Sequence, residues 1–318
     1  RFLSHAGSTE GEGAQTETAL AQEPLANEKK DRQAIIELYA GFNFRMDELN
    51  WNIAGNMDGT NPNILSELTW EELGIYELSV GFSSLVKQSV YFRGYLKYGH
   101  IISGENQDSD YGADDRQDEF SRSNNSADNG STIDISMGAG LMLPIIKDII
   151  TITPLVGLSY HRQNLTISDG YQTIPDLGYF PGLDSTYEAK WMGPWVGLEM
   201  AIDIETGWRA LPRFCPFVGF EYHWALFDAT ADWNLREEFD HPKSFEQEAE
   251  GSGMSLMVGL GAAFSEGWSL EFGYTQQKWL AEDGTETVFF SDGTFGETRL
   301  NEVNWESRAV RMAIHYRF

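Results

Sequence analysis

The chain has 318 residues, and its 22 Lys and Arg stand against 49 Asp and Glu, a formal charge of -27. This charge would repel nucleic acid, and it favours cationic partners such as basic peptides or proteins. Apolar residues make up 41% of the chain but form no run near the roughly 18 residues that a membrane helix needs, which excludes a helical membrane protein.

The first part of the chain has no strand or helix period. Residues 1–32 are rich in Glu, Gln, Ala and Thr, which predicts a mobile amino-terminal arm preceding the domain at 33–318. Ser4-His5-Ala6 before Gly7 resembles the small-residue tail of a cleavage site, so residues 1–6 are interpreted as a signal remnant.

From Ile36 onward the chain alternates between apolar and polar residues with a period of two, which is typical of β-strands with two different faces. Ten such segments follow in order, at about 36–47, 64–82, 89–104, 131–143, 150–168, 185–204, 214–235, 243–264, 267–288 and 297–318. The connections alternate between short turns and long polar loops, as at 104–130 and 169–184. An even number of strands, joined in this way, predicts a closed antiparallel transmembrane β-barrel that rises beyond the membrane on the long-loop side.

The last segment alternates up to an aromatic carboxy terminus, Phe318, which is typical of a bacterial outer-membrane barrel with its long loops outside the cell. A soluble β-sandwich is the alternative fold. Charged residues on the polar faces, such as Arg93, Glu221 and Arg311, fit a hydrated barrel lumen better. Most of the tryptophans are predicted to lie in aromatic girdles at the two membrane interfaces.

Four segments follow one another within about residues 36–318: Leu65–Trp70, the stretch Gly104–Tyr111, Tyr222–Asn234 and the carboxy-terminal strand to Phe318. In this order they resemble the omptin family of outer-membrane endopeptidases. The resemblance implies a ten-stranded barrel with an active site in an extracellular cleft. There a water would lie between an Asp pair and an Asp-His pair.

The aspartate pair implied by the resemblance is Asp108 and Asp110. Alternate residues of an extended segment put two carboxylates on one face, where they can share a proton and hold a water. The same loop also carries Glu105, Asp114 and Asp115, so a merely solvated acidic loop is the alternative interpretation.

The second half of the implied site departs from the family pattern. Asp232 matches the family's Asp, but Asn234 stands where the family has its catalytic His. An amide cannot accept a proton near neutral pH, so Asn234 cannot be the general base. His241 could replace it only if the following loop folded back, and strict alternation from Tyr222 would turn Asp232 outward unless a bulge intervened.

The family's lipopolysaccharide-binding cluster is matched in part by Tyr160 and Arg162, which suggests a lipid contact. The acidic loop with His223 and His241 lacks the tight ligand spacing of a metal site, and neither a metal nor a cofactor is predicted.

Three functions follow from these patterns. The leading hypothesis is an omptin-like barrel with impaired or absent peptidase activity and a surface binding or structural role. The second is an active endopeptidase that cleaves at basic residues, and the third is a narrow porin. Ten strands enclose a lumen that side chains can largely fill, which counts against the porin.

Overall fold

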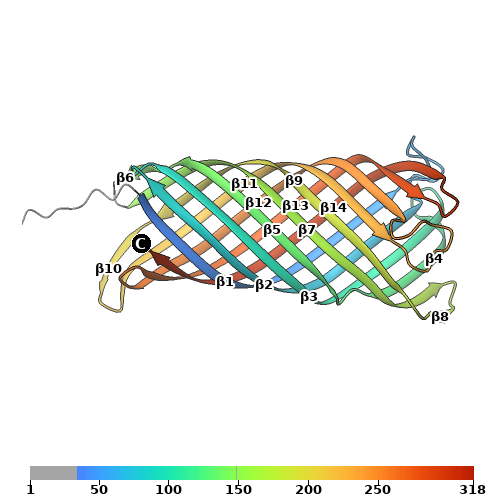
Figure 1. Cartoon of the computed structure of the whole chain (residues 1–318), viewed down its shortest axis with the longest axis horizontal. Helices are drawn as coiled ribbons and strands as arrows, with labels where there is room; N and C mark the ends of the chain where they lie inside the picture. The colour runs from blue at the N-terminus through green and yellow to red at the C-terminus, as the bar shows by residue number, and fades with distance from the viewer. Residues whose placement is uncertain (1–33, 148) are drawn as a thin grey trace, which may run out of the picture. The chain divides into compact units, whose positions relative to one another are not determined.

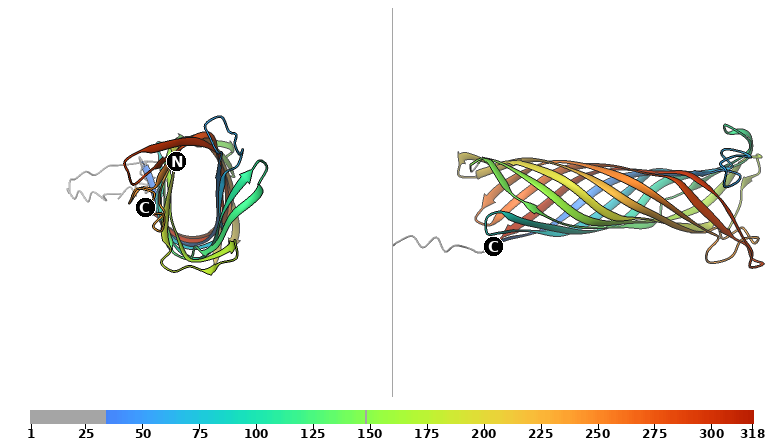
Figure 2. Two further views of the ribbon diagram at one scale, coloured as in Figure 1. Left: turned by 90° about the vertical axis from the view of Figure 1, so that its right-hand side faces the viewer. Right: turned by 90° about the horizontal axis from the view of Figure 1, so that it is seen from above.

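A computed structural model describes residues 34–147 and 149–318, which form a barrel of antiparallel strands (Figure 1). Seen along its axis, the ring of strands is flattened (Figure 2). The ring follows the chain through β1 (Ala34–Ile53), β2 (Ser66–Val86), β3 (Val90–Ala113), β5 (Gly130–Leu141), β7 (Ile150–Ile174), β9 (Asp184–Ile202), β11 (Leu211–Asp232), β12 (Phe245–Ser265), β13 (Trp268–Phe289) and β14 (Phe295–Arg317).

Pairing between β14 and β1 closes the ring, from Glu37 opposite Arg317 to Ile53 opposite Leu300. The predicted closed antiparallel barrel of about ten strands is therefore confirmed, and the sandwich alternative is wrong. The predicted arm at 1–32 and the signal remnant at 1–6 lie outside the described residues. No helix in the described part of the chain is long and apolar enough to span a membrane.

Four short strands extend the walls: β4 (Gln117–Ser126), β6 (Leu143–Ile146), β8 (Gly178–Tyr179) and β10 (Ile204–Trp208). The predicted loop at 104–130 is wrong in part, because β3 continues to Ala113 and forms a hairpin with β4. Asp115 and Arg116, both with φ near 60°, make the tight turn between them. Asp108 and Asp110 thus lie on a strand and not in a solvated loop.

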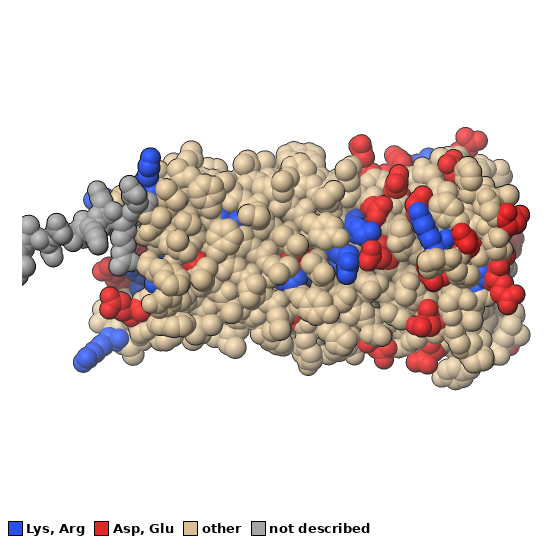
Figure 3. Space-filling view, in the orientation of Figure 1, with Lys and Arg blue, Asp and Glu red and all other residues tan. Residues whose placement is uncertain are grey.

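The polarity of each wall reverses along the barrel axis. On β1, the outward residues Phe42, Phe44 and Met46 are exposed, while Arg45 and Asp47 are buried inside. Further along the same strand, Glu48 faces out and Leu49, Trp51 and Ile53 are buried. Figure 3 shows the resulting outer surface: a broad face with few charges, then Lys, Arg, Asp and Glu gathered toward the long-loop end. An apolar belt on the outer face is typical of the part of a barrel that contacts lipid, whereas an apolar interior is typical of a part that is surrounded by water.

The interior at the long-loop end is filled by aromatic side chains. Trp279 and Trp305 stack with ring centroids 5.3 Å apart, and Tyr187 stacks on Trp70 at 5.0 Å. The prediction that most tryptophans lie in interfacial girdles is therefore wrong. Six are buried inside the barrel, namely Trp51, Trp70, Trp191, Trp195, Trp279 and Trp305, whereas Trp208, Trp224 and Trp268 are exposed.

Beneath this aromatic core lies a buried polar network centred on Arg45. Its guanidinium donates hydrogen bonds to Asp47, Glu77 and Asp134, and Asp134 also bonds to His161 at 2.9 Å. His161 packs against Trp279 at 4.8 Å between ring centroids. The network and the core together fill the barrel interior between its two ends with buried side chains.

Candidate functional site

A cleft of about 260 Å³ opens at the long-loop end, above the aromatic core. On one side, Asp108 and Asp110 of β3 face inward beside Ser121 and Ser123 of β4, their partners in the register. The alternation that places Asn106 inside carries both aspartates to the same face, two and four residues further along β3. The structure thus brings the two predicted aspartates together in one cleft.

Burial changes the titration of this pair. Desolvation, then repulsion from Asp110, raises the pKa of Asp108 to about 7, while the charge of Arg236 opposes the rise. Desolvation also raises the pKa of Asp110, against hydrogen bonds from Ser66 and Ser121 and the charge of Arg236. Both shifts favour a protonated carboxyl in this pair closer to neutral pH, which is the usual result of two carboxylates meeting away from bulk water.

The opposite wall of the cleft is apolar and was not foreseen from the sequence. It is formed by Phe180, Leu183, Trp233 and Leu235, with Arg236 at its edge. Arg236 is the single Lys or Arg between Asp228 and His241. An isolated cation in an acidic stretch could have indicated that Arg236 lies close to carboxylates. Sequence reasoning also missed Asn125, which is 8% exposed, lines the cleft and has no hydrogen-bond partner for Oδ1 among the described residues.

The side-chain amide of Asn234 forms hydrogen bonds that connect two segments of the barrel wall. Its Oδ1 accepts hydrogen bonds from the backbone N–H of Asp184 at 2.9 Å and from Ser185 Oγ at 3.1 Å. Its Nδ2 donates to the carbonyl oxygen of Gly182 at 2.7 Å. Both ends of the amide thus hold the start of β9 against the end of β11, beside the cleft.

Asp232 lies on the outer face of β11. It follows the same alternation as Leu226 and Asp228, and its pairing with Thr186 shows no bulge that would turn it inward. Nδ1 of His241 lies 2.6 Å from Oδ1 of Asp232, so the loop after Asn234 does fold back. Neither residue lines the cleft that holds Asp108 and Asp110.

The predicted lipid contacts, Tyr160 and Arg162, face outward on β7 at the edge of the apolar belt. Arg162 lies 3.6 Å from Glu188, and Lys190 lies 2.9 Å from Glu188 and 3.4 Å from Asp228. In this cluster, two cations meet two carboxylates, so the patch around Tyr160 carries little net charge.

The barrel is similar in fold to the outer membrane protease OmpT from Escherichia coli. The match has a TM-score of 0.73 and 11% identity and covers 89% of this chain and 97% of that chain. The translocator domain of the autotransporter NalP from Neisseria meningitidis also matches, at 14% identity over 89% of this chain and 88% of that chain, with a TM-score of 0.39. No curated protein sequence matches the chain.

At 11% identity the omptin likeness shows a shared fold only. A family model of Protochlamydia outer membrane proteins, Pom, matches residues 39–318. This match spans nearly all of the barrel, from the first strand to the aromatic carboxy terminus. The chain therefore belongs to the Protochlamydia outer membrane protein family and is an outer-membrane β-barrel of omptin-like fold.

Proposed function

We propose that this barrel is a surface receptor that binds basic peptide segments in its extracellular cleft and does not hydrolyse them by the omptin route. The observation that carries the proposal is the composition of the cleft: three hydrogen-bond acceptors, Asp108, Asp110 and Asn125, face an apolar wall. An Arg or Lys side chain supplies N–H donors and a positive charge, and its neighbour in the peptide can pack on Phe180 and Leu183.

The absence of a base in the right place supports binding without turnover. In the omptin-like alignment Asn234 takes the place of the catalytic His, and its amide is bound to Gly182, Asp184 and Ser185. Among residues 34–147 and 149–318, no histidine lines the cleft. His241 has an Asp partner, but the pair lies on the outer face of β11, across the wall from Asp108 and Asp110.

Binding is tested with the refolded protein in detergent and a fluorescent peptide that contains paired arginines. Saturable binding is expected, and Asp110→Asn should weaken it by roughly tenfold or more, as for loss of a charged hydrogen bond. The matched control is Asp118→Asn, which removes the same charge from an exposed position of the β3–β4 hairpin. A peptide with citrulline in place of arginine should not bind. Equal binding of both peptides would contradict the proposal.

Hydrolysis is tested separately, with fluorogenic peptides that carry a dibasic sequence. The wild type and Asp110→Ala should both leave the peptides intact. Turnover by the wild type that is lost in Asp108→Asn or Asp110→Ala would instead establish the rival function, an active endopeptidase. In that case His241→Ala decides whether the outer Asp232–His241 pair takes part.

A further inference from the structure

A second hollow lies at the other end of the barrel, where the strands are joined by short turns. It consists of an inner cavity of about 300 Å³ and a mouth of about 730 Å³. The two share Glu37, Cys215, Phe217, Glu271 and His315 as lining residues, so they form one vestibule. Because the long loops face the outside of the cell, this vestibule opens toward the periplasm.

The inner end of the vestibule borders on the aromatic core and the Arg45 network. Gln277 lines the cavity there and accepts a hydrogen bond from Trp279 Nε1 at 3.1 Å, which joins it to the aromatic core. Asn43 lines the same end and donates to Glu77 in the Arg45 network. A molecule that enters from the periplasm therefore meets hydrogen-bonded side chains of these two layers.

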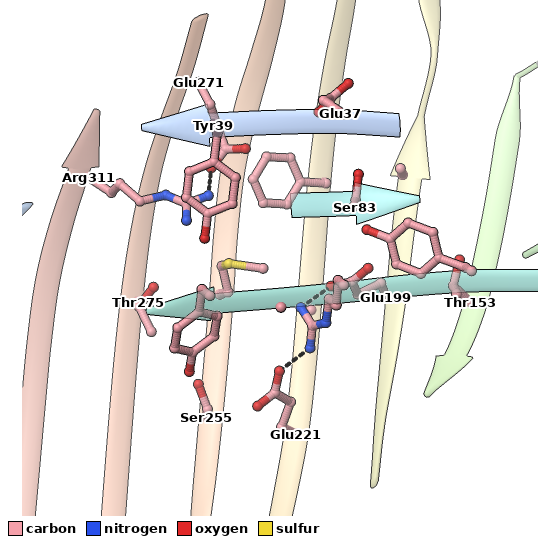
Figure 4. Close-up of a pocket in the computed structure, with 18 of the residues that line it drawn as sticks. Glu37, Tyr39, Ser83, Thr153, Glu199, Glu221, Ser255, Glu271, Thr275 and Arg311 are labelled. Carbon is pink, nitrogen blue, oxygen red and sulfur yellow. Dashed lines mark hydrogen bonds and ion pairs between the residues drawn. The ribbon is translucent and has the colours of Figure 1, made fainter. Parts of the chain in front are cut away.

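The three Lys and Arg that line the inner cavity are already paired with carboxylates. Arg93 donates to both Glu199 and Glu221, and Arg311 donates to Glu271, as the labelled pair in Figure 4 shows. The third, Lys97, lies 3.6 Å from Glu77. An anion entering this cavity would have to break such a pair, which leaves a buried carboxylate without its partner and is costly.

Two hydrogen-bond acceptors of the inner cavity, in contrast, can accept further hydrogen bonds. Asn43 is 1% exposed, and its Oδ1 has no hydrogen-bond partner within the described residues. Glu199 receives the Arg93 bond on Oε1, which leaves Oε2 for another donor. The inner cavity is lined by four carboxylates, Glu37, Glu199, Glu221 and Glu271, and three Lys and Arg, and Glu37 is paired in addition with Arg317. The acceptors that remain without a partner favour a ligand that donates hydrogen bonds.

Aromatic rings define the rest of the lining. Tyr39, Tyr91, Tyr95 and Phe217 border the cavity, and the rings of Tyr39 and Tyr95 already lie 5.1 Å and 5.0 Å from Arg311 and Lys97. Such rings attract ammonium and guanidinium groups and cover their methylene chains. No cluster of three metal-binding side chains occurs in the part of the chain that the structure describes, so a bare metal ion fits less well.

We propose that the periplasmic vestibule binds a small organic cation, an aliphatic ammonium or guanidinium compound, through Glu199, the free oxygen of Asn43 and the tyrosine rings. This site is independent of the extracellular cleft, because the Arg45 network and the aromatic core separate the two.

The first test is calorimetry of the full-length protein in detergent with spermidine. Saturable binding is expected, and Glu199→Gln should weaken it by roughly tenfold or more. Glu266→Gln removes an equal charge from an exposed turn at the same end and should leave the affinity unchanged. Asp118→Asn, at an exposed position of the β3–β4 hairpin at the opposite end, should also have no effect. Equal losses in Glu199→Gln and Glu266→Gln, or a loss in Asp118→Asn, would overturn the proposal. Heat-modifiable mobility on gels confirms that each variant is folded.

The second test uses Cys215, the single cysteine, which lines the vestibule. A cationic methanethiosulfonate reagent should modify Cys215 faster than an anionic reagent of equal size, and spermidine should slow the reaction. Glu199→Gln should reduce both effects. If the anionic reagent reacts as fast, or if spermidine gives no protection, the vestibule does not select cations and the proposal is wrong.

Discussion

Nδ1 of His241 and Oδ1 of Asp232 lie 2.6 Å apart on the outer face of β11. An Asp-His pair is thus present near the cleft, but the β9–β11 wall separates it from Asp108 and Asp110. The position of a residue in a β-strand decides its face, so a side chain one position away would have faced the cleft.

Asn234→Ala is expected to loosen the rim of the cleft, the segment where the start of β9 is held against the end of β11. The variant loses the bonds to Gly182, Asp184 and Ser185, and each such bond contributes about 1 kcal/mol. Hydrogen exchange of the Asp184 and Ser185 amides should become faster, and peptide binding weaker. Asn124→Ala, at an exposed position of β4, is the control. Unchanged exchange at residues 184 and 185 would show that the amide does not hold the rim.

Binding of a basic peptide should strengthen as the pH rises through neutrality. The pKa of Asp108 is raised to about 7, so the free cleft keeps a proton that a cationic ligand must displace. Affinity should increase by roughly tenfold from pH 6 to pH 8, in line with release of one proton. Fluorescence anisotropy across this range measures the effect. Asp108→Asn should give a flat profile, and a flat profile in the wild type would contradict the assignment.

Glu286→Gln should change how stability depends on pH. Burial raises the pKa of Glu286 to about 7, and Gln247 donates to it at 2.6 Å. The folded state keeps this proton after the unfolded state has lost it. The Glu286 side chain therefore lowers the free energy of unfolding as pH rises from about 4.5 to about 7, by roughly 3 kcal/mol in all.

The measurement is urea unfolding at several pH values. Asp108 titrates in the same window, so Glu286→Gln is compared in an Asp108→Asn background. The loss of stability between pH 5 and pH 7 should become smaller in the double variant. An equal slope with and without Glu286 would mean that this carboxyl does not stay protonated in the folded barrel.

The wild-type barrel should show no steady conductance in planar bilayers. The stacked rings of Trp279 and Trp305, with Arg45 and its partners below, fill the lumen. Replacing both rings with alanine removes this filling and should produce channel openings. Trp224→Ala, whose ring is exposed on the outer face, is the control. A steady open channel in the wild type would favour the porin hypothesis.

Lipopolysaccharide should bind to the patch around Tyr160 only weakly. Glu188 lies close to both Arg162 and Lys190, and it offsets the charge that a lipid phosphate would need. Arg162→Ala should therefore change the affinity by less than about twofold, as exposed ion pairs contribute little. Glu188→Ala should increase it. A large loss in Arg162→Ala, measured with lipopolysaccharide vesicles, would show that the arginine contacts the lipid.

The sequence by itself determined the barrel and its location. A period of two, repeated in ten segments and ending at Phe318, is a local property of each strand, and it specifies two faces without any knowledge of distant contacts. The sequence also carries a second pattern: on β1, the apolar residues change face after Met46, where the wall leaves the lipid. That reversal predicts an aromatic interior and would have placed Trp51 correctly.

Only the tertiary structure decided the sites. Asp108 becomes part of a cleft because β11 and its loop bring Trp233 and Arg236 across from β3, more than 100 residues away in the chain. The side of the wall on which His241 lies depends on how a loop returns to Asp232, which no local pattern encodes. The proposed cation site in the periplasmic vestibule likewise combines single residues from many strands. The acceptors available to a ligand there depend on how Arg93 and Arg311 pair with the carboxylates around them.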